Sequence, residues 1–140
     1  MKEIKGNQTV YLEDYDVTVN KYLTYAQIQQ IANAVVAASV NDSDDTWANR
    51  QTNIDMLMLY HATDIGKEKL EEIGHDDLLT SGLIDRVQFR IENYHEIYAA
   101  IDYIENNQRA INKLLKSLPK VLEETKGLQD LMKKHGETTY

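Results

Sequence analysis

This chain of 140 residues contains no cysteine, one proline, one tryptophan, one phenylalanine and six glycines. The absence of cysteine excludes disulfide bonds and thiolate metal sites, and it is typical of a reducing compartment. The scarcity of proline and glycine leaves few helix breakers and favours long helices. The longest apolar run, residues 34–38, is too short to cross a bilayer, and the first six residues lack the apolar core of a signal peptide. We therefore expect one domain over residues 1–140 that makes no contact with a membrane.

Acidic residues outnumber basic ones, and the excess is unevenly distributed. Residues 1–112 hold 9 Lys/Arg and 19 Asp/Glu, a balance of −10, whereas residues 113–140 hold 6 and 4, a balance of +2. Phosphate repels an acidic surface, so we expect no direct binding of nucleic acid. The charge either serves solubility or presents an acidic face to a basic partner, and the basic C-terminal part could dock on an acidic neighbouring subunit.

The first half of the chain predicts a hairpin followed by a helical pair. β-Branched and aromatic residues at 9–12 and 15–19 predict a β-hairpin over 8–20. Thr24 and Gln27 have the spacing of a capping box, which opens a helix over 25–38. A polar break at 41–45 precedes a second helix over 46–64, and a short helix over 67–73 ends at Gly74. These helices form a helical pair over 24–74, with expected buried faces of Ile28, Ile31, Ala32, Val35 and Val36 on the first helix and Trp47, Ile54, Leu57, Met58 and His61 on the second.

An apolar stripe dominates the second half of the chain. It comprises Leu83, Val87, Ile91, Tyr94, Tyr98, Ile101, Ile104, Gln108, Ile111, Leu115 and Leu118, with no proline or glycine between the first and the last. The mean spacing of about 3.5 residues is that of a helix that packs along another helix. A single helix over this range would be about 54 Å long, whereas a compact domain of this size has a diameter of roughly 37 Å. The helix therefore either breaks near residues 106–107 or projects and meets a partner.

These patterns together predict a mainly α fold. Pro119 can begin a new helix, so residues 82–134 should form a long helix plus a C-terminal helix. The expected architecture is a helical bundle with one long C-terminal amphipathic helix and a short N-terminal β-hairpin. Four of the nine tyrosines lie between positions 11 and 25. They either mark an interface or replace phenylalanine in a thin core with wet edges.

The possible metal motifs are weak. Paired Glu-x-x-His sequences at 72–75 and 92–95 resemble those that hold two metal ions in helical carboxylate proteins. Gly74 places the first pair at a helix end, however, and the apolar stripe points Tyr94 rather than His95 inward. His61, His75, Asp76 and Asp85 lie within too short a stretch for a metal phosphohydrolase, and the acidic run at 42–45 lacks the glycine of a calcium loop. We assign no catalytic, cofactor-binding or metal residues and expect no cofactor.

Three stretches carry a resemblance to known proteins: YLTYAQI at 22–28, NIDMLMLYHATD at 53–64 and TSGLID at 80–85. In these stretches the chain resembles small uncharacterised proteins of tailed bacteriophages of Gram-positive hosts, which are acidic, cysteine-free and helical. The resemblance implies a part in virion assembly or in disarming a host defence. It also implies a location in the bacterial host cytoplasm, or in the virion. It transfers no functional residue.

Three functional hypotheses follow. The first is a non-catalytic protein that associates with itself, and with another protein, as a phage structural or assembly component. The second is an acidic inhibitor of a host defence protein that uses Asp42, Asp44, Asp45, Glu68, Glu71 and Glu72. The third is a metal-dependent enzyme with histidine and carboxylate ligands. Under the first hypothesis the expected contact residues are Ile91, Tyr94, Tyr98, Ile101, Ile104, Ile111, Leu115 and Leu118, with Tyr11 and Tyr15 of the hairpin as a second contact.

Overall fold

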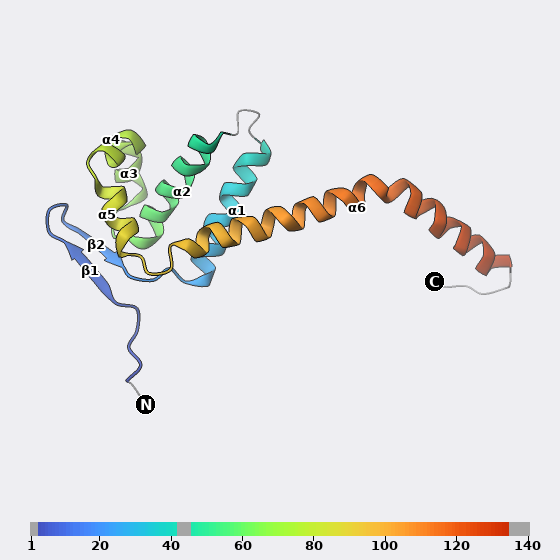
Figure 1. Cartoon of the computed structure of the whole chain (residues 1–140), viewed down its shortest axis with the longest axis horizontal. Helices are drawn as coiled ribbons and strands as arrows, with labels where there is room; N and C mark the ends of the chain where they lie inside the picture. Colours follow the sequence, from blue (N-terminus) through green and yellow to red (C-terminus); the bar gives the residue numbers. More distant parts are fainter. Residues whose placement is uncertain (1–2, 42–45, 135–140) are drawn as a thin grey trace. The chain divides into compact units, whose positions relative to one another are not determined.

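The computed structural model describes the backbone of residues 3–41 and 46–134 and the side chains of residues 3–39 and 46–117. Within these limits the fold is mainly helical, with a short N-terminal hairpin and a long C-terminal helix, as predicted (Figure 1). The contacts divide the chain into two compact units, Met1–Ile104 and Glu105–Tyr140. The elements in chain order are β1 (Thr9–Leu12), β2 (Val17–Asn20), α1 (Tyr25–Asn41), α2 (Trp47–Ala62), α3 (Lys67–Ile73), α4 (His75–Thr80), α5 (Leu83–Arg90) and α6 (His95–Lys134).

The hairpin packs one face on the helices and is closed along one edge. β1 and β2 pair antiparallel, with Leu12 opposite Val17. Val17 and Val19 are buried and Thr18 between them is half-buried, as expected for a strand with one face on a core. The outer edge of β2 is occupied by Asp64, which follows α2. Its backbone N–H donates to the Thr18 carbonyl (3.2 Å) and its Oδ1 accepts from the Thr18 N–H (3.0 Å).

The predicted starts of the two central helices are confirmed. The Gln27 N–H donates to Thr24 Oγ1 (3.1 Å) and the Thr24 N–H donates to Gln27 Oε1 (2.9 Å), which is the reciprocal geometry of a capping box. All five residues expected on the buried face of α1 are buried. The prediction that Trp47 is buried is wrong, because Trp47 is the first residue of α2 and is 80% exposed. The buried face of α2 includes Leu59 and Ala62 beside the predicted Ile54 and Met58. The predicted Leu57 and His61 are only half-buried.

The helix expected to begin at Leu83 is interrupted between residues 91 and 94, not near 106–107. The reason is competition from tertiary hydrogen bonds. The Glu92 N–H donates to the Lys21 carbonyl (2.7 Å). The Asn93 side chain brackets Leu23, because its Oδ1 accepts from the Leu23 N–H (3.0 Å) and its Nδ2 donates to the Leu23 carbonyl (2.9 Å). The break therefore exists because residues 91–94 lie along the segment that joins β2 to α1.

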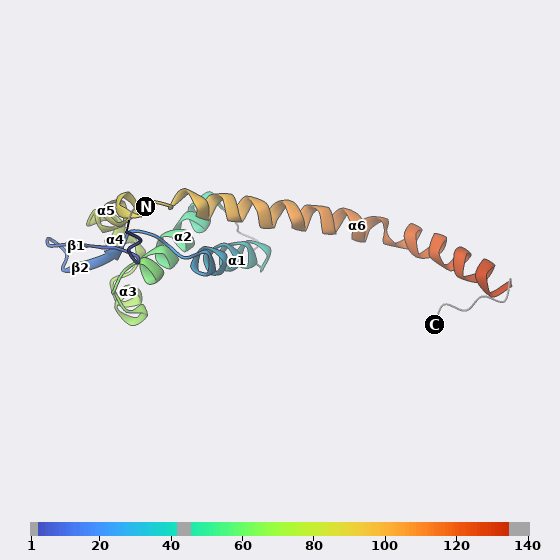
Figure 2. The ribbon, with the colours of Figure 1, turned by 90° about the horizontal axis from the view of Figure 1, so that it is seen from below.

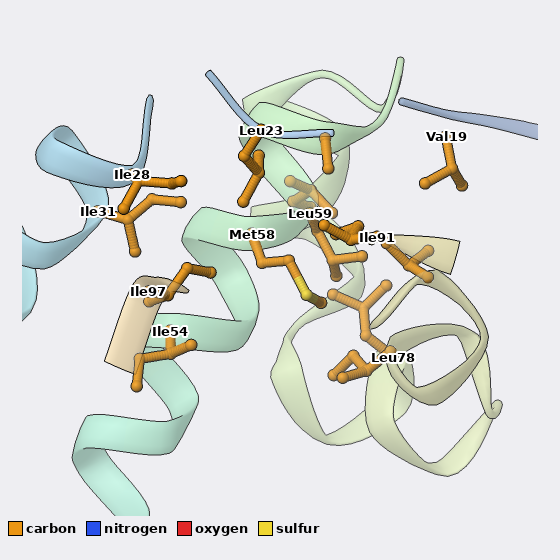
Figure 3. Packing of buried hydrophobic residues seen from close by; sticks show 14 of the residues in the cluster. Val19, Leu23, Ile28, Ile31, Ile54, Met58, Leu59, Leu78, Ile91 and Ile97 are labelled. Atoms are coloured by element: carbon orange, nitrogen blue, oxygen red, sulfur yellow. The ribbon is translucent and has the colours of Figure 1, made fainter. Parts of the chain in front are cut away.

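The core of unit 1–104 centres on α2. Figure 2 shows α1 and α2 side by side, and Figure 3 shows Met58 among side chains from several elements. Met58 and Leu59 are fully buried, and Ile97 of α6 joins the same cluster. The first turns of α6 therefore belong to the core. Farther along, α6 passes through Pro119 and Gly127 as one helix, so the separate helix expected after Pro119 does not form.

Candidate functional site

The predicted contact stripe divides between the chain's own core and an exposed face. Ile91 and Ile101 are each 4% exposed and belong to the core cluster, and Ile104 is half-buried against it. The expectation that Ile91 and Ile101 face a partner is therefore wrong. The break before α6 turns Ile97 into the core, and Ile101 follows it one helical turn later.

The exposed face lies on the part of α6 that belongs to the second unit. We call residues 105–134 the C-terminal segment of α6. Ile111 and Leu115 are each 55% exposed, as expected for contact residues, and Leu114, which the stripe omitted, is 59% exposed. The side chain of Leu118 lies outside the described residues. Within the described part of unit Glu105–Tyr140, no second helix or strand is present to cover this face.

A second feature is a polar cluster around the buried carboxylate of Asp55, which is 3% exposed. Its Oδ2 lies 2.8 Å from His75 Nε2, and its Oδ1 accepts a hydrogen bond from Gln51 Nε2 (2.9 Å). A buried carboxylate needs such partners because desolvation otherwise disfavours its charge. The pair links α4 to the middle of α2.

Two tyrosines of the predicted stripe extend this cluster to α6. The Tyr98 hydroxyl donates to Gln51 Oε1 (2.9 Å), and the Tyr94 and Tyr98 hydroxyl oxygens are 2.9 Å apart. The two rings pack edge to face with centroids 5.6 Å apart. Burial, followed by the hydrogen bond with Tyr98, raises the pKa of Tyr94 well above its usual range. Tyr94 and Tyr98 therefore fasten the start of α6 to α2, although Tyr98 remains 38% exposed.

The two hairpin tyrosines differ in their surroundings. Tyr11 is 56% exposed, and its hydroxyl donates to Asp16 Oδ1 (2.6 Å), a hydrogen bond that raises the pKa of Tyr11. Tyr15 is half-buried, donates to the Ser81 carbonyl (2.8 Å) and lies under the guanidinium of Arg86. Tyr15 thus anchors the hairpin to the end of α4, whereas Tyr11 offers its ring to solvent.

An open cavity of about 630 Å³ lies beside Tyr15. Val17, Ile65 and Leu78 contribute apolar lining, and the polar residues of the lining are Tyr15, Asp16, Asp64, Lys69, Asp77 and Ser81. Two of the carboxylates already accept internal hydrogen bonds, Asp16 from Tyr11 and Asp64 from the Thr18 N–H. Within this mixed lining, Tyr15 and Asp64 join the hairpin to the helical part, whereas the hydrogen bond between Tyr11 and Asp16 lies within the hairpin.

Among the described residues, no three His, Asp or Glu side chains lie close enough together to hold a metal ion. His75, from the first Glu-x-x-His sequence, pairs with Asp55, and His95, from the second, is exposed. The acidic run at 42–45 lies outside the described residues. Over the described helices, none combines the length and apolar character needed to span a bilayer.

Sequence reasoning missed Asn93, Gln51 and Leu114. Gln51 lies on α2 and Asn93 lies in the break between α5 and α6, and only their hydrogen-bond partners in space explain them. Leu114 is a large apolar residue that the stripe leaves out, and its position directly before Leu115 could have been noticed in the sequence. Comparisons with protein-family models, with characterised proteins and with solved structures give no match to this chain. Function is therefore inferred from the chain's own surfaces.

Proposed function

We propose that this protein is a non-catalytic interaction protein that associates with itself through the C-terminal segment of α6. One observation carries the proposal: Ile111, Leu114 and Leu115 are more than half exposed on a helix that has no other described element in its unit. Burying each of these side chains against a partner would contribute roughly 1.5–3 kcal/mol. A second copy of the same segment supplies the matching apolar face.

The helix itself supports this reading. Most helical stability in proteins comes from packing of an amphipathic face, which a lone helix lacks. The C-terminal segment also carries Pro119 and Gly127. An interior proline costs about 3 kcal/mol and an interior glycine about 1 kcal/mol relative to alanine. Packing against another helix offsets these costs, so association and helix formation support each other.

The net charges of the two units also favour association through the second unit. Residues 1–104 hold 8 Lys/Arg and 18 Asp/Glu, a balance of −10, and residues 105–140 hold 7 and 5, a balance of +2. The net negative charge of residues 1–104 makes these parts of different copies repel each other, whereas residues 105–140 carry a balance of only +2. Self-association is therefore least opposed where the exposed apolar residues lie.

We place this activity in virion assembly, on the strength of the resemblance to small phage proteins described above. The protein would act in the bacterial host cytoplasm or within the virion, bound to other copies and to a further assembly protein. Tyr11, exposed at the hairpin, is a second surface for that further protein.

The alternative function is inhibition of a host defence protein, and one observation favours it. The exposed sides of α3 and α4 carry a group of carboxylates, namely Glu68, Glu71, Glu72, Asp76 and Asp77. Such a surface would occupy a basic groove, and its binding would weaken steeply as salt increases. Binding to a basic target that is unchanged between low and high salt would count against this alternative.

Self-association is tested by removing the apolar face without touching the core. The double variant Ile111→Asp with Leu115→Asp should be monomeric by light scattering at high micromolar concentration, whereas the wild type should be oligomeric. The matched control is Asn106→Asp with Ser117→Asp, which adds the same charge on the opposite side of the helix and should leave the oligomer intact. A wild type that is monomeric under these conditions refutes the proposal.

A further inference from the structure

The apolar residues of the C-terminal segment cover more than a narrow seam. Leu114 and Leu115 are neighbours in sequence, so their side chains leave the helix about 100° apart. Both are more than half exposed, at 59% and 55%. One partner helix lying along Leu115 therefore cannot also cover Leu114.

The sequence register of α6 supports this geometry. In heptad notation Ile104 and Ile111 occupy position d, and Gln108 and Leu115 occupy position a. Leu114 then falls at position g, which a two-stranded coiled coil normally fills with a charged residue. In the sequence, Val121 and Leu128 recur at the same position after seven and fourteen residues. An apolar set at a, d and g is typical of helices in the interior of a bundle, where the apolar face is wider.

We infer that the C-terminal segment assembles into a bundle of at least three copies, in which each segment contacts two neighbours. This inference rests on the proposed self-association. One neighbour packs along Ile111 and Leu115, and the other covers Leu114. Gln108 is a polar residue within the apolar seam, and such a residue fixes the register of associated helices. A two-stranded assembly would leave Leu114 in water.

The test measures the number of chains in the assembly of the intact protein. Sedimentation equilibrium and native mass spectrometry of the wild type should give three or more copies. Leu114→Gln keeps a helix-forming side chain but removes the apolar contact, and it should reduce the assembly to dimers or raise the concentration of half-assembly roughly tenfold or more. Lys113→Gln is the control at heptad position f, outside the apolar positions a, d and g, and it should retain the wild-type number.

Each outcome separates this inference from the proposed function. A wild-type dimer overturns the bundle but leaves self-association standing, whereas a wild-type monomer overturns both. Wild-type stoichiometry and concentration dependence in Leu114→Gln also overturn the bundle. Circular dichroism checks that the variant folds, and Leu114→Ala, which removes the same contact with the strongest helix former, must give the same result.

Discussion

Asn93 should be the residue that holds the break between α5 and α6. Its side-chain amide makes two hydrogen bonds with the backbone of Leu23, at 3.0 and 2.9 Å. A net contribution of about 0.5–1.5 kcal/mol for each bond gives about 1–3 kcal/mol in total. Leu23 is buried, so losing the amide leaves its backbone groups poorly solvated. We therefore expect Asn93→Ala to lower the free energy of unfolding by about 2–3 kcal/mol.

Urea unfolding followed by far-ultraviolet circular dichroism measures this loss, which should lower the unfolding midpoint by about 1–2 M. Asn93→Asp keeps an acceptor for the Leu23 N–H but sets a carboxylate against the Leu23 carbonyl, so it should be no more stable than the alanine variant. Asn33→Ala is the control, because Asn33 is exposed on α1 and should change stability by less than about 0.5 kcal/mol. Stability of Asn93→Ala within about 0.5 kcal/mol of the wild type would refute this account of the break.

Three further outcomes are expected. Gly82→Ala should destabilise the protein by about 1 kcal/mol or more in urea, because Gly82 has a φ of +84° and an added Cβ would lie 3.2 Å from the Tyr15 hydroxyl. The raised pKa of Tyr94 means that the unfolded chain loses its proton first, so stability should hold below about pH 10 and fall above it, and Tyr94→Phe should reduce that fall. Burial lowers the pKa of His61. As the pH decreases, His61 therefore gains a proton in the unfolded chain before it does so in the folded one. Stability should be retained above about pH 6.5 and should decrease at lower pH, and the decrease should be smaller in His61→Gln.

The parts of the fold that the sequence predicts well are those whose signals are local. The capping box at Thr24 and Gln27 needs only residues three apart, and the structure reproduces both of its hydrogen bonds. Gly74 ends α3 with a φ of +84°, a backbone conformation that glycine adopts more readily than other residues. Neither inference depends on what lies across the molecule, which is why both hold.

The break at residues 91–94 had no such signal. It contains no proline or glycine, and the apolar spacing runs through it unchanged. Asparagine competes for backbone hydrogen bonds and so weakens a helix, but the sequence contains asparagines at 106 and 107 as well. Only Asn93 has an extended backbone within reach, that of Leu23, and this pairing of residues 70 apart was not visible in the sequence.

The same limit explains why the stripe predicted helices but not which of its residues are buried in the chain's own core. Ile101 and Ile111 are identical residues in one periodic pattern, yet the first is 4% exposed and the second 55%. The spacing indicates only that a helix packs an apolar face against something, because packing on the chain's own core and packing on a neighbouring chain require the same spacing of apolar residues. The change occurs after Ile104, the last residue of the first unit and the last of the stripe to touch its core. Substituting Ile101 would therefore test folding, and only residues beyond Ile104 can test association.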